Sequence, residues 1–181
     1  LSKAGYSVTV YNRTSQKAQD WLSTYNTGDA KVSASNTVAQ ACEGADIVFI
    51  CVGNDNDVRD VGTQALAVMK TGSVLVDHTT ASADIARELY KSCQDKQVGF
   101  LDAPVSGGQA GAENGQLTIM VGGDEDVYST VEPVMAHYAR HSQLLGKSGS
   151  GQLAKMMNQI CIAGIVQGLA EALHFGQRAG L

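Results

Sequence analysis

Short hydrophobic runs alternate with longer amphipathic stretches through most of the chain. Runs rich in β-branched and aromatic residues predict strands at 6–11, 31–34, 46–52, 73–77, 98–102, 117–121 and 139–145. The stretches between them have helical spacing and predict helices at 14–25, 37–43, 57–69, 82–94 and 124–136. This alternation predicts an α/β fold, a doubly wound and mostly parallel sheet with helices on both faces.

The start of the chain predicts an incomplete first unit. Residues 1–5 have the character of a helix end, and Gly5 suits the left-handed position that often follows one. In a Rossmann-type fold the glycine-rich loop lies about 20 residues before the end of the second strand. Counting back from Tyr11 runs off the start of the chain. We therefore expect residues 1–148 to be a dinucleotide-binding domain whose first βα unit is missing.

A long apolar helix is predicted over residues 150–179, with Ser150 as its N-cap. We interpret residues 149–181 as an interdomain helix that begins an all-α domain, the rest of which is missing. Polar residues within the apolar run, such as Gln167 and Glu171, argue against a membrane span.

Composition narrows the possible partners and cofactors. The net charge of −5 and the lack of a basic stripe argue against nucleic acid as a partner. No cluster has metal-ligand spacing, so we predict no metal, and His78 is interpreted as a turn or packing residue. Four cysteines without a CxxC pair predict reduced, mostly buried thiols in a cytoplasmic protein; they are Cys42, Cys51, Cys93 and Cys161.

The end of the first predicted strand favours one nicotinamide cofactor over the other. An acidic residue there would bind the 2′-hydroxyl of NAD. Asn12, Arg13 and Thr14 instead offer amide, guanidinium and hydroxyl donors, with Lys17 one turn further on. This set suits the 2′-phosphate of NADP. Taken alone, the segment would be read as a strand end with a solvated arginine, but the surrounding βαβ pattern favours a cofactor site.

Three further strand ends should line the same crevice, because ligands of such folds bind at the carboxyl ends of the strands. They are residues 52–57, 77–82 and 102–108. Each alone would be an ordinary turn. In the last of them, Ser106, Gly107 and Gly108 present consecutive amides without bulky side chains, which can cradle a carboxylate.

One polar group interrupts the apolar helix. Lys155, Asn158 and Gln159 are spaced i, i+3 and i+4, so they share one side. A lysine near a reacting oxygen can move a proton and stabilise developing negative charge. For an isolated pair of this kind a surface lysine is the simpler interpretation, and the carboxylate turn together with the strand order favours catalysis.

Two segments, FLDAPVSGGQAGAENGQLTIMVGG (residues 100–123) and GSGQLAKMMNQ (residues 149–159), resemble the β-hydroxyacid dehydrogenase family. That family includes 3-hydroxyisobutyrate dehydrogenase and tartronate semialdehyde reductase and, more distantly, 6-phosphogluconate dehydrogenase. The resemblance extends over essentially the whole chain. It implies a dinucleotide domain, a connecting helix and an all-helical domain, and homo-oligomers formed through the helical domains.

The resemblance also implies residue roles. Lys155 matches the catalytic lysine, and the turn at 106–108 matches the substrate-carboxylate site. The amides at 158 and 159 match substrate-binding positions, and the Asn-Gln pair is similar to tartronate semialdehyde reductases. Asp57 departs from the neutral residue that some members carry. The positions that match contacts to the nicotinamide half of the cofactor are Val52, Gly53, Asp57 and Thr80.

We therefore predict an NADP-dependent oxidoreductase that acts on a short 3-hydroxy acid or its semialdehyde, with Lys155 as general acid/base. One alternative is an NAD-dependent 3-hydroxyisobutyrate or serine-type dehydrogenase. Related imine reductases generally lack this lysine. A non-catalytic interaction module that reuses the fold, and a chain that binds no cofactor without its glycine loop, are further alternatives.

Overall fold

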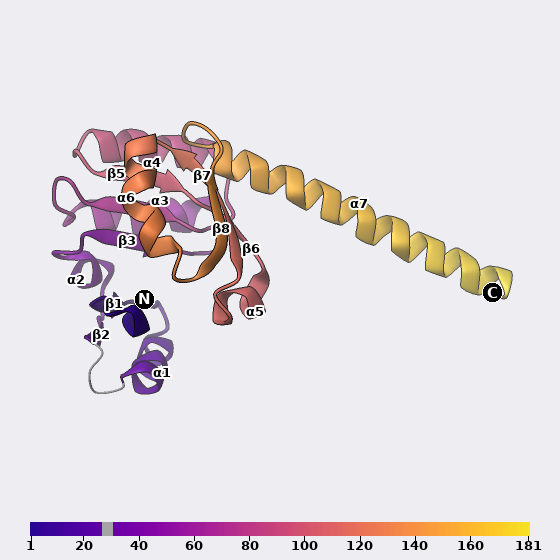
Figure 1. Cartoon of the computed structure of the whole chain (residues 1–181), viewed down its shortest axis with the longest axis horizontal. Coiled ribbons are helices and arrows are strands. Elements are labelled where there is room, and N and C mark those ends of the chain that lie inside the picture. Colours follow the sequence, from indigo (N-terminus) through magenta and orange to yellow (C-terminus); the bar gives the residue numbers. More distant parts are fainter. Residues whose placement is uncertain (27–30) are drawn as a thin grey trace.

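The computed structural model describes residues 1–26 and 31–181 (Figure 1). A short 3₁₀ helix (Ser2–Ala4) comes first. The strands are β1 (Val8–Val10), β2 (Val32–Ala34), β3 (Ile47–Ile50), β4 (Val74–Asp77), β5 (Gly99–Asp102), β6 (Val105–Ser106), β7 (Leu117–Gly123) and β8 (Ala139–Leu144). The α-helices are α1 (Ser15–Tyr25), α2 (Val38–Cys42), α3 (Asp55–Leu66), α4 (Ala83–Gln94), α5 (Gly108–Glu113), α6 (Glu125–Met135) and α7 (Ser150–Ala179).

The strands form two sheets. A six-stranded sheet has the order β3-β4-β5-β7-β6, with β8 also paired to β7, and the separate two-stranded sheet joins β1 to β2. Pairings β1/β2, β3/β4, β4/β5 and β7/β8 are parallel, and β7 runs antiparallel to both β5 and β6. The predicted doubly wound, mostly parallel α/β fold is therefore confirmed.

Alternate residues of the central strands face two cores, as expected from the two-residue period of a strand. Leu75 and Phe100 face a core that includes residues of α3 and α4. Val76 and Leu101 face the other core, which is completed by β7 and α6. The carboxyl ends of β3, β4 and β5 consequently meet at one edge, between the helical layers.

Most predicted elements are present, with shorter strands than expected. Two were missed, because β6 has two residues and α5 has six, too few for a periodic pattern. Strand β3 is less buried than an apolar run of this length (residues 46–52) indicates. Its residues alternate between buried and half-buried, because β3 pairs only with β4 in the described part of the chain and borders an open groove.

The start of α7 differs from the prediction that Ser150 is its N-cap. The N-cap is Gly149, whose φ of 93° lies in the left-handed region that favours glycine, and Ser150 is the first helical residue. No side-chain hydroxyl caps the helix. The Asp102 carboxylate accepts from the Gly149 and Gln152 amides instead, so a carboxylate from β5 replaces the predicted hydroxyl cap.

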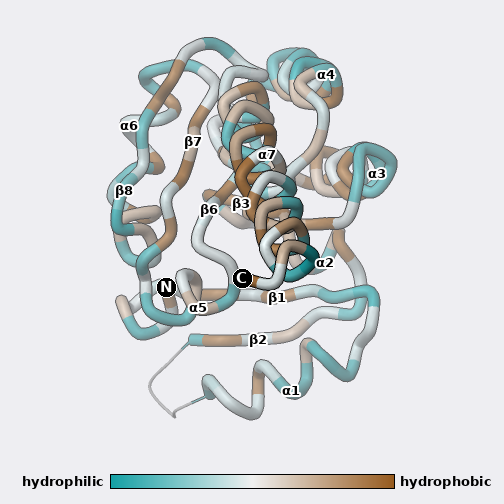
Figure 2. The backbone as a smooth tube through the Cα atoms, turned by 90° about the vertical axis from the view of Figure 1, so that its right-hand side faces the viewer, coloured by the Kyte–Doolittle hydropathy of each residue, from teal (hydrophilic) through white to brown (hydrophobic). Residues whose placement is uncertain are grey.

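Beyond its first turns α7 points away from the sheets and is exposed along its length (Figure 1). Figure 2, turned by 90°, shows hydrophobic residues along this helix. By length and composition alone α7 could cross a membrane. The expectation that its polar residues argue against a span therefore stays a prediction, as does the division of the chain at residue 148.

Candidate functional site

A groove of about 880 Å³ lies between the two sheets and is lined by both β1 and β3. It gathers seven of the eight residues predicted to bind the cofactor. They are Asn12, Arg13, Thr14 and Lys17 from the β1 side, and Val52, Gly53 and Asp57 from the β3 side. Thr80 does not line the groove and lies exposed after β4.

The turn after β1 presents its polar side chains at the surface of the groove. The Asn12 side-chain oxygen accepts from the Thr14 amide at 2.9 Å, which fixes the turn. Thr14 is the N-cap residue of α1, as predicted, but its hydroxyl makes no capping bond. Arg13 is 88% exposed at its side chain, and its guanidinium lies 4.0 Å from the Asp57 carboxylate. All four predicted residues of this turn are exposed.

The turn after β3 is built by Asn54, which caps α3 by accepting from the amides of Asn56 and Asp57. Asn54 also donates to the Asp57 carboxylate at 3.0 Å. A Cβ added at Gly53 would lie 2.8 Å from that carboxylate, so a larger residue here would displace the Asp57 side chain from its present position. Asp57 thus faces Arg13 from the opposite side of the groove.

A buried hydrogen-bonded junction ties α7 to the strand ends. Asp102, the last residue of β5, accepts from the Gly149 amide at 2.7 Å and from the Gln152 amide at 3.0 Å. The fully buried Gln152 side chain donates to the Thr79 carbonyl and accepts from the Ala81 amide. Helix α7 is therefore held at the carboxyl ends of β4 and β5.

Two buried carboxylates stand side by side in this junction. Asp77 and Asp102 are register partners on β4 and β5, and both are fully buried. Burial raises the pKa of Asp77 to about 6, against the opposing hydrogen bonds from Thr79. Burial likewise raises the pKa of Asp102 to about 6, against the amides of Gly149 and Gln152. The second oxygen of Asp77 has no hydrogen-bond partner among the described residues.

Lys155 lies one turn beyond this junction and is buried, with 9% of its surface exposed. Within the described residues it forms no salt bridge, and no hydrogen bond with either predicted partner amide. The Asn158 amide is half-buried and points its nitrogen to the Gln159 oxygen at 3.4 Å. Along the side of α7 that these three residues share, Lys155 is buried, Asn158 is half-buried and Gln159 is exposed.

The turn at Ser106, Gly107 and Gly108 has the predicted open backbone. Ser106 ends β6, and the two glycines have φ values of 131° and 61°, which favour glycine. Strand β7 links this turn to α7, because Thr118 pairs with Ser106 and the Met120 carbonyl lies against Gly151. Both predicted halves of the substrate site therefore rest on one strand.

His78 has the packing role that was expected. Its Nδ1 donates to the Ala103 carbonyl at 2.7 Å, its Nε2 is hydrogen-bonded to the Tyr138 hydroxyl at 2.8 Å, and its ring stacks on Phe49. Burial lowers the pKa of His78 and raises that of Tyr138. Both shifts favour the neutral form of the group.

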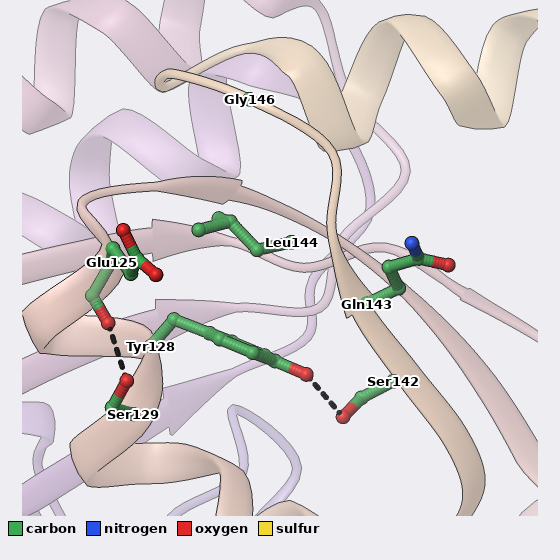
Figure 3. Close-up of a pocket in the computed structure, with 7 residues that line it drawn as sticks. All are labelled: Glu125, Tyr128, Ser129, Ser142, Gln143, Leu144 and Gly146. Carbon is green, nitrogen blue, oxygen red and sulfur yellow. Dashed lines mark hydrogen bonds between the residues drawn. The ribbon is translucent and has the colours of Figure 1, made fainter.

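Other features carry no predicted site residue. A hollow of about 520 Å³ lies between α6 and β8, where the Tyr128 and Ser142 hydroxyls are 3.0 Å apart and Ser129 donates to the Glu125 carbonyl (Figure 3). Within residues 1–26 and 31–181, no group of three metal-ligating side chains is close enough to hold an ion. All four cysteines are free, but two of them, Cys51 and Cys161, are exposed rather than buried.

Sequence reasoning missed Gln152, and within the predicted strand ends it gave no individual role to Asp77, Thr79 or Asp102. The two aspartates end the apolar runs SVLVD and GFLD, and a charge at the end of a buried strand was the signal available. Gln152 lies three residues before Lys155, so it shares a helix face with it. Its burial depended on the strand ends meeting α7, which the local pattern could not show.

Known protein families and proteins are similar to this chain in sequence. Residues 1–149 match the model of the NAD-binding domain of 6-phosphogluconate dehydrogenase. All of the chain aligns at 56% identity with an uncharacterised oxidoreductase of Shewanella frigidimarina, covering 62% of that protein. It also aligns in full, at 42% identity, with a probable 3-hydroxyisobutyrate dehydrogenase-like protein of Arabidopsis thaliana, covering 53% of it.

Among solved structures, 3-hydroxyisobutyrate dehydrogenase of Mycobacterium tuberculosis with L-serine has a TM-score of 0.90 and 30% identity. The match covers 99% of this chain and 60% of that one. The chain thus spans between half and two thirds of the length of the relatives named here. By the domain match, the identity and the shared fold, the chain belongs to the β-hydroxyacid dehydrogenase family, whose cofactor domain is that of 6-phosphogluconate dehydrogenase.

Proposed function

We propose that this chain is the cofactor domain and connecting helix of an NADP-dependent oxidoreductase that interconverts a short 3-hydroxy acid and its semialdehyde. The observation that carries the proposal is the place of Lys155. It is a buried lysine without an acidic partner among the described residues, one turn from a helix start that is clamped to the ends of β4 and β5. Ligands of doubly wound sheets bind at those strand ends.

Each polar group then has a distinct task. The cofactor, when bound, would supply or accept the hydride. Lys155 would remove the hydroxyl proton during oxidation and return it during reduction. The amides and hydroxyl at Ser106, Gly107 and Gly108 would hold the substrate carboxylate, with Asn158 and Gln159 orienting its polar end.

The residues at the end of β1 fit a 2′-phosphate. Arg13 and Lys17 are exposed cations on the groove, beside the hydrogen-bond donors of Asn12 and Thr14. Charge-assisted bonds from arginine to phosphate are strong and geometrically specific. The 4.0 Å contact to Asp57 is exposed, so Arg13 can leave it for a phosphate at small cost.

The groove itself supports one further part of this proposal. Within the described residues β1 pairs only with β2, and β3 only with β4, and both strands line the groove. The doubly wound order 3-2-1-4-5-6 then has one vacant position, its first strand, between β1 and β3. We propose that a parallel strand and its glycine-rich turn fill this position in the complete cofactor site.

Replacement of Lys155 tests the function. In the full-length protein, Lys155→Ala should lower turnover by about 10²–10⁴-fold, because a general acid/base is worth that much. NADPH binding should stay nearly unchanged, as measured by titration of its fluorescence. Turnover that survives the substitution would exclude Lys155 as the acid/base.

Cofactor choice is tested separately, by comparing kcat/KM for NADPH and NADH. We expect NADPH to be preferred, and Arg13→Ala to shrink the ratio by roughly tenfold through loss of a charge-assisted bond. Lys91→Ala, an exposed cation on α4, is the matched control. A preference for NADH in the unaltered protein would show that the β1 turn does not bind a 2′-phosphate.

The second candidate is an NAD-dependent 3-hydroxyisobutyrate or serine-type dehydrogenase. It is favoured by the mycobacterial neighbour, whose structure contains L-serine. A panel of short semialdehydes, hydroxy acids and L-serine, followed by nicotinamide absorbance with each cofactor, separates the two. We further propose that the complete protein is cytoplasmic and homo-oligomeric, with the exposed apolar length of α7 covered by helical partners.

A further inference from the structure

The Gln152 side chain holds both peptide groups that flank Thr80. Its nitrogen donates to the Thr79 carbonyl at 2.7 Å, and its oxygen accepts from the Ala81 amide at 3.0 Å. The Thr79 carbonyl belongs to the peptide before Thr80, and the Ala81 amide to the peptide after it. One fully buried carboxamide therefore fixes the backbone of a residue that itself lies exposed at the end of β4.

The backbone of Gln152 is also bonded to a second strand end, that of β5. The Gln152 amide donates to the Asp102 carboxylate at 3.0 Å, beside the bond from Gly149. The Thr79 hydroxyl, in turn, accepts from the Val52 amide at 3.0 Å. Gln152 thus joins α7 to the ends of β4 and β5, and Thr79 joins the end of β4 to that of β3.

We propose that Gln152 is a positioning residue that sets the place of Lys155 relative to the Thr80 loop. The two residues are spaced i and i+3, so they are neighbours on one face of α7. A rotation or slide of the helix start that breaks the Gln152 bonds must also move Lys155. The inference rests on the proposed function of Lys155 as acid/base.

A side chain that only matched the volume of Gln152 could not perform this role. A methionine at this position would match the volume of glutamine, but it would leave the Thr79 carbonyl and the Ala81 amide without partners. A single planar group that carries both a donor and an acceptor satisfies both peptides. Glutamine alone among the neutral side chains combines that group with this reach; asparagine is one methylene shorter.

Gln152→Glu distinguishes a positioning role from a purely structural one through the pH dependence of kcat. A protonated carboxyl can donate to Thr79 and accept from Ala81, as the amide does. An ionised one offers only acceptors and repels the Thr79 carbonyl. Asp102 on β5 accepts from the Gln152 amide, and Asp77 on β4 is its register partner. Arg87 on α4 lies against Gly149, and Lys155 is one turn along α7. Burial and the two aspartates would raise the pKa of the introduced carboxyl and the two cations would lower it; because position 152 is fully buried, the rise from desolvation is the larger effect.

The experiment measures kcat and KM from pH 5 to 9 in the full-length protein. The log ratio of kcat for Gln152→Glu to kcat for the unaltered protein should be near zero at low pH and fall as the pH rises. Gln152→Met should lower kcat by about 10–100-fold at every pH, with KM for NADPH little changed, because misplacement by about an ångström costs that much. Gln167→Met, on the exposed part of α7, is the matched control and should change neither constant.

Three results would overturn the positioning role: Gln152→Met with unaltered kcat, a kcat ratio for Gln152→Glu that does not vary with pH, or loss confined to KM. Thermal unfolding of each variant identifies any loss that comes from unfolding, and Gln152→Glu, active at low pH, keeps the test decisive if Gln152→Met does not fold. Lys155→Ala is measured in parallel. If that variant keeps full turnover, the proposed function fails; if only the Gln152 variants behave like the unaltered protein, the positioning role fails alone.

Discussion

The first turn of α7 and the rest of the same helix have opposite surroundings. From Gly149 to Lys155 the helix is pressed between strand ends, and its amides and the Gln152 side chain bond to other elements. From residue 160 onward nearly every residue is exposed, including Ile160, Ile165 and Phe175 at about 70%. Hydrophobic periodicity is found in both parts, but only the first part has a partner in the described structure.

The difference shows what locates a chemical group in this fold. The apolar part of α7 is long, yet nothing within the described residues fixes its position. The first turn is short, and the ends of β4 and β5 fix it through hydrogen bonds. The position of Lys155 therefore depends on buried hydrogen bonds more than on helix hydrophobicity.

The largest effect on stability is expected from adding a side chain at a glycine. Gly151, in the first part of α7, is tightly surrounded, whereas Gly168, in the second part, is not. A Cβ at Gly151 would lie 2.6 Å from the Asp102 carbonyl and closer still to that of Met120, and both are backbone atoms. Gly151→Ala should lower the free energy of unfolding by about 3 kcal/mol. Gly168→Ala, with no atom within 4 Å, should raise it by up to about 1 kcal/mol.

Denaturant unfolding of both variants in the 181-residue chain checks this contrast. Equal stabilities would mean that the start of α7 is not packed against β5 and β7 as described.

A smaller, pH-dependent effect on stability is expected from Asp77 at the end of β4, whose second carboxylate oxygen has no hydrogen-bond partner among the described residues. Burial raises the pKa of Asp77 from 3.8 to about 6, so the folded state binds its proton more tightly than the unfolded state does. The stability from this proton is complete below about pH 4 and is lost as the pH rises through 6. The free energy of unfolding of Asp77→Asn should therefore exceed that of the unaltered protein by on the order of 2 kcal/mol at pH 7.5 and by almost nothing at pH 4.

Thermal melts across pH 4–8 measure that gain, with Asp60→Asn on the exposed side of α3 as control. Asp102 keeps some pH dependence in the variant, because burial also raises its pKa to about 6. A gain that is the same at pH 4 and 7.5 would contradict the buried charge.

The smallest effect on stability is expected in the exposed part of α7. Ile165→Gln removes a side chain that is 69% exposed, so the free energy of unfolding of the 181-residue chain should change by less than about 0.5 kcal/mol. Its self-association, followed by light scattering, should fall because an apolar surface has been interrupted. A clear loss of stability would show that this part of the helix folds back onto the domain.

The sequence predicted the elements that follow from local periodicity. The apolar runs ending at Asp77 and Asp102 are strands, and the long helical pattern is one helix. It did not predict α5, which has no period of its own, or the capping of α7 by Asp102 in place of Ser150. The capping of α7 depends on a contact between residues 47 positions apart.

The candidate site could likewise be predicted only where it depends on local pattern or strand order. Topology predicted that the turns at Arg13 and Gly53 would meet, because strand ends share an edge, and both line one groove. Gln152 was not predicted, since its role depends on which peptides lie beside α7. Motif spacing placed Lys155 on the helix, but only the fold shows what holds it there.

Chemical rescue tests the acid/base role of Lys155 most directly. Lys155→Ala should lose turnover, and added methylamine or ethylamine should restore part of it, with a rate that rises with the amine concentration and basicity. Gln167→Ala, on the same helix, should keep its turnover and gain nothing from the amine. Rescue of this kind would show that an amine at this position transfers the proton, and a Lys155→Ala variant that keeps full turnover, or gains none from any amine, would contradict it.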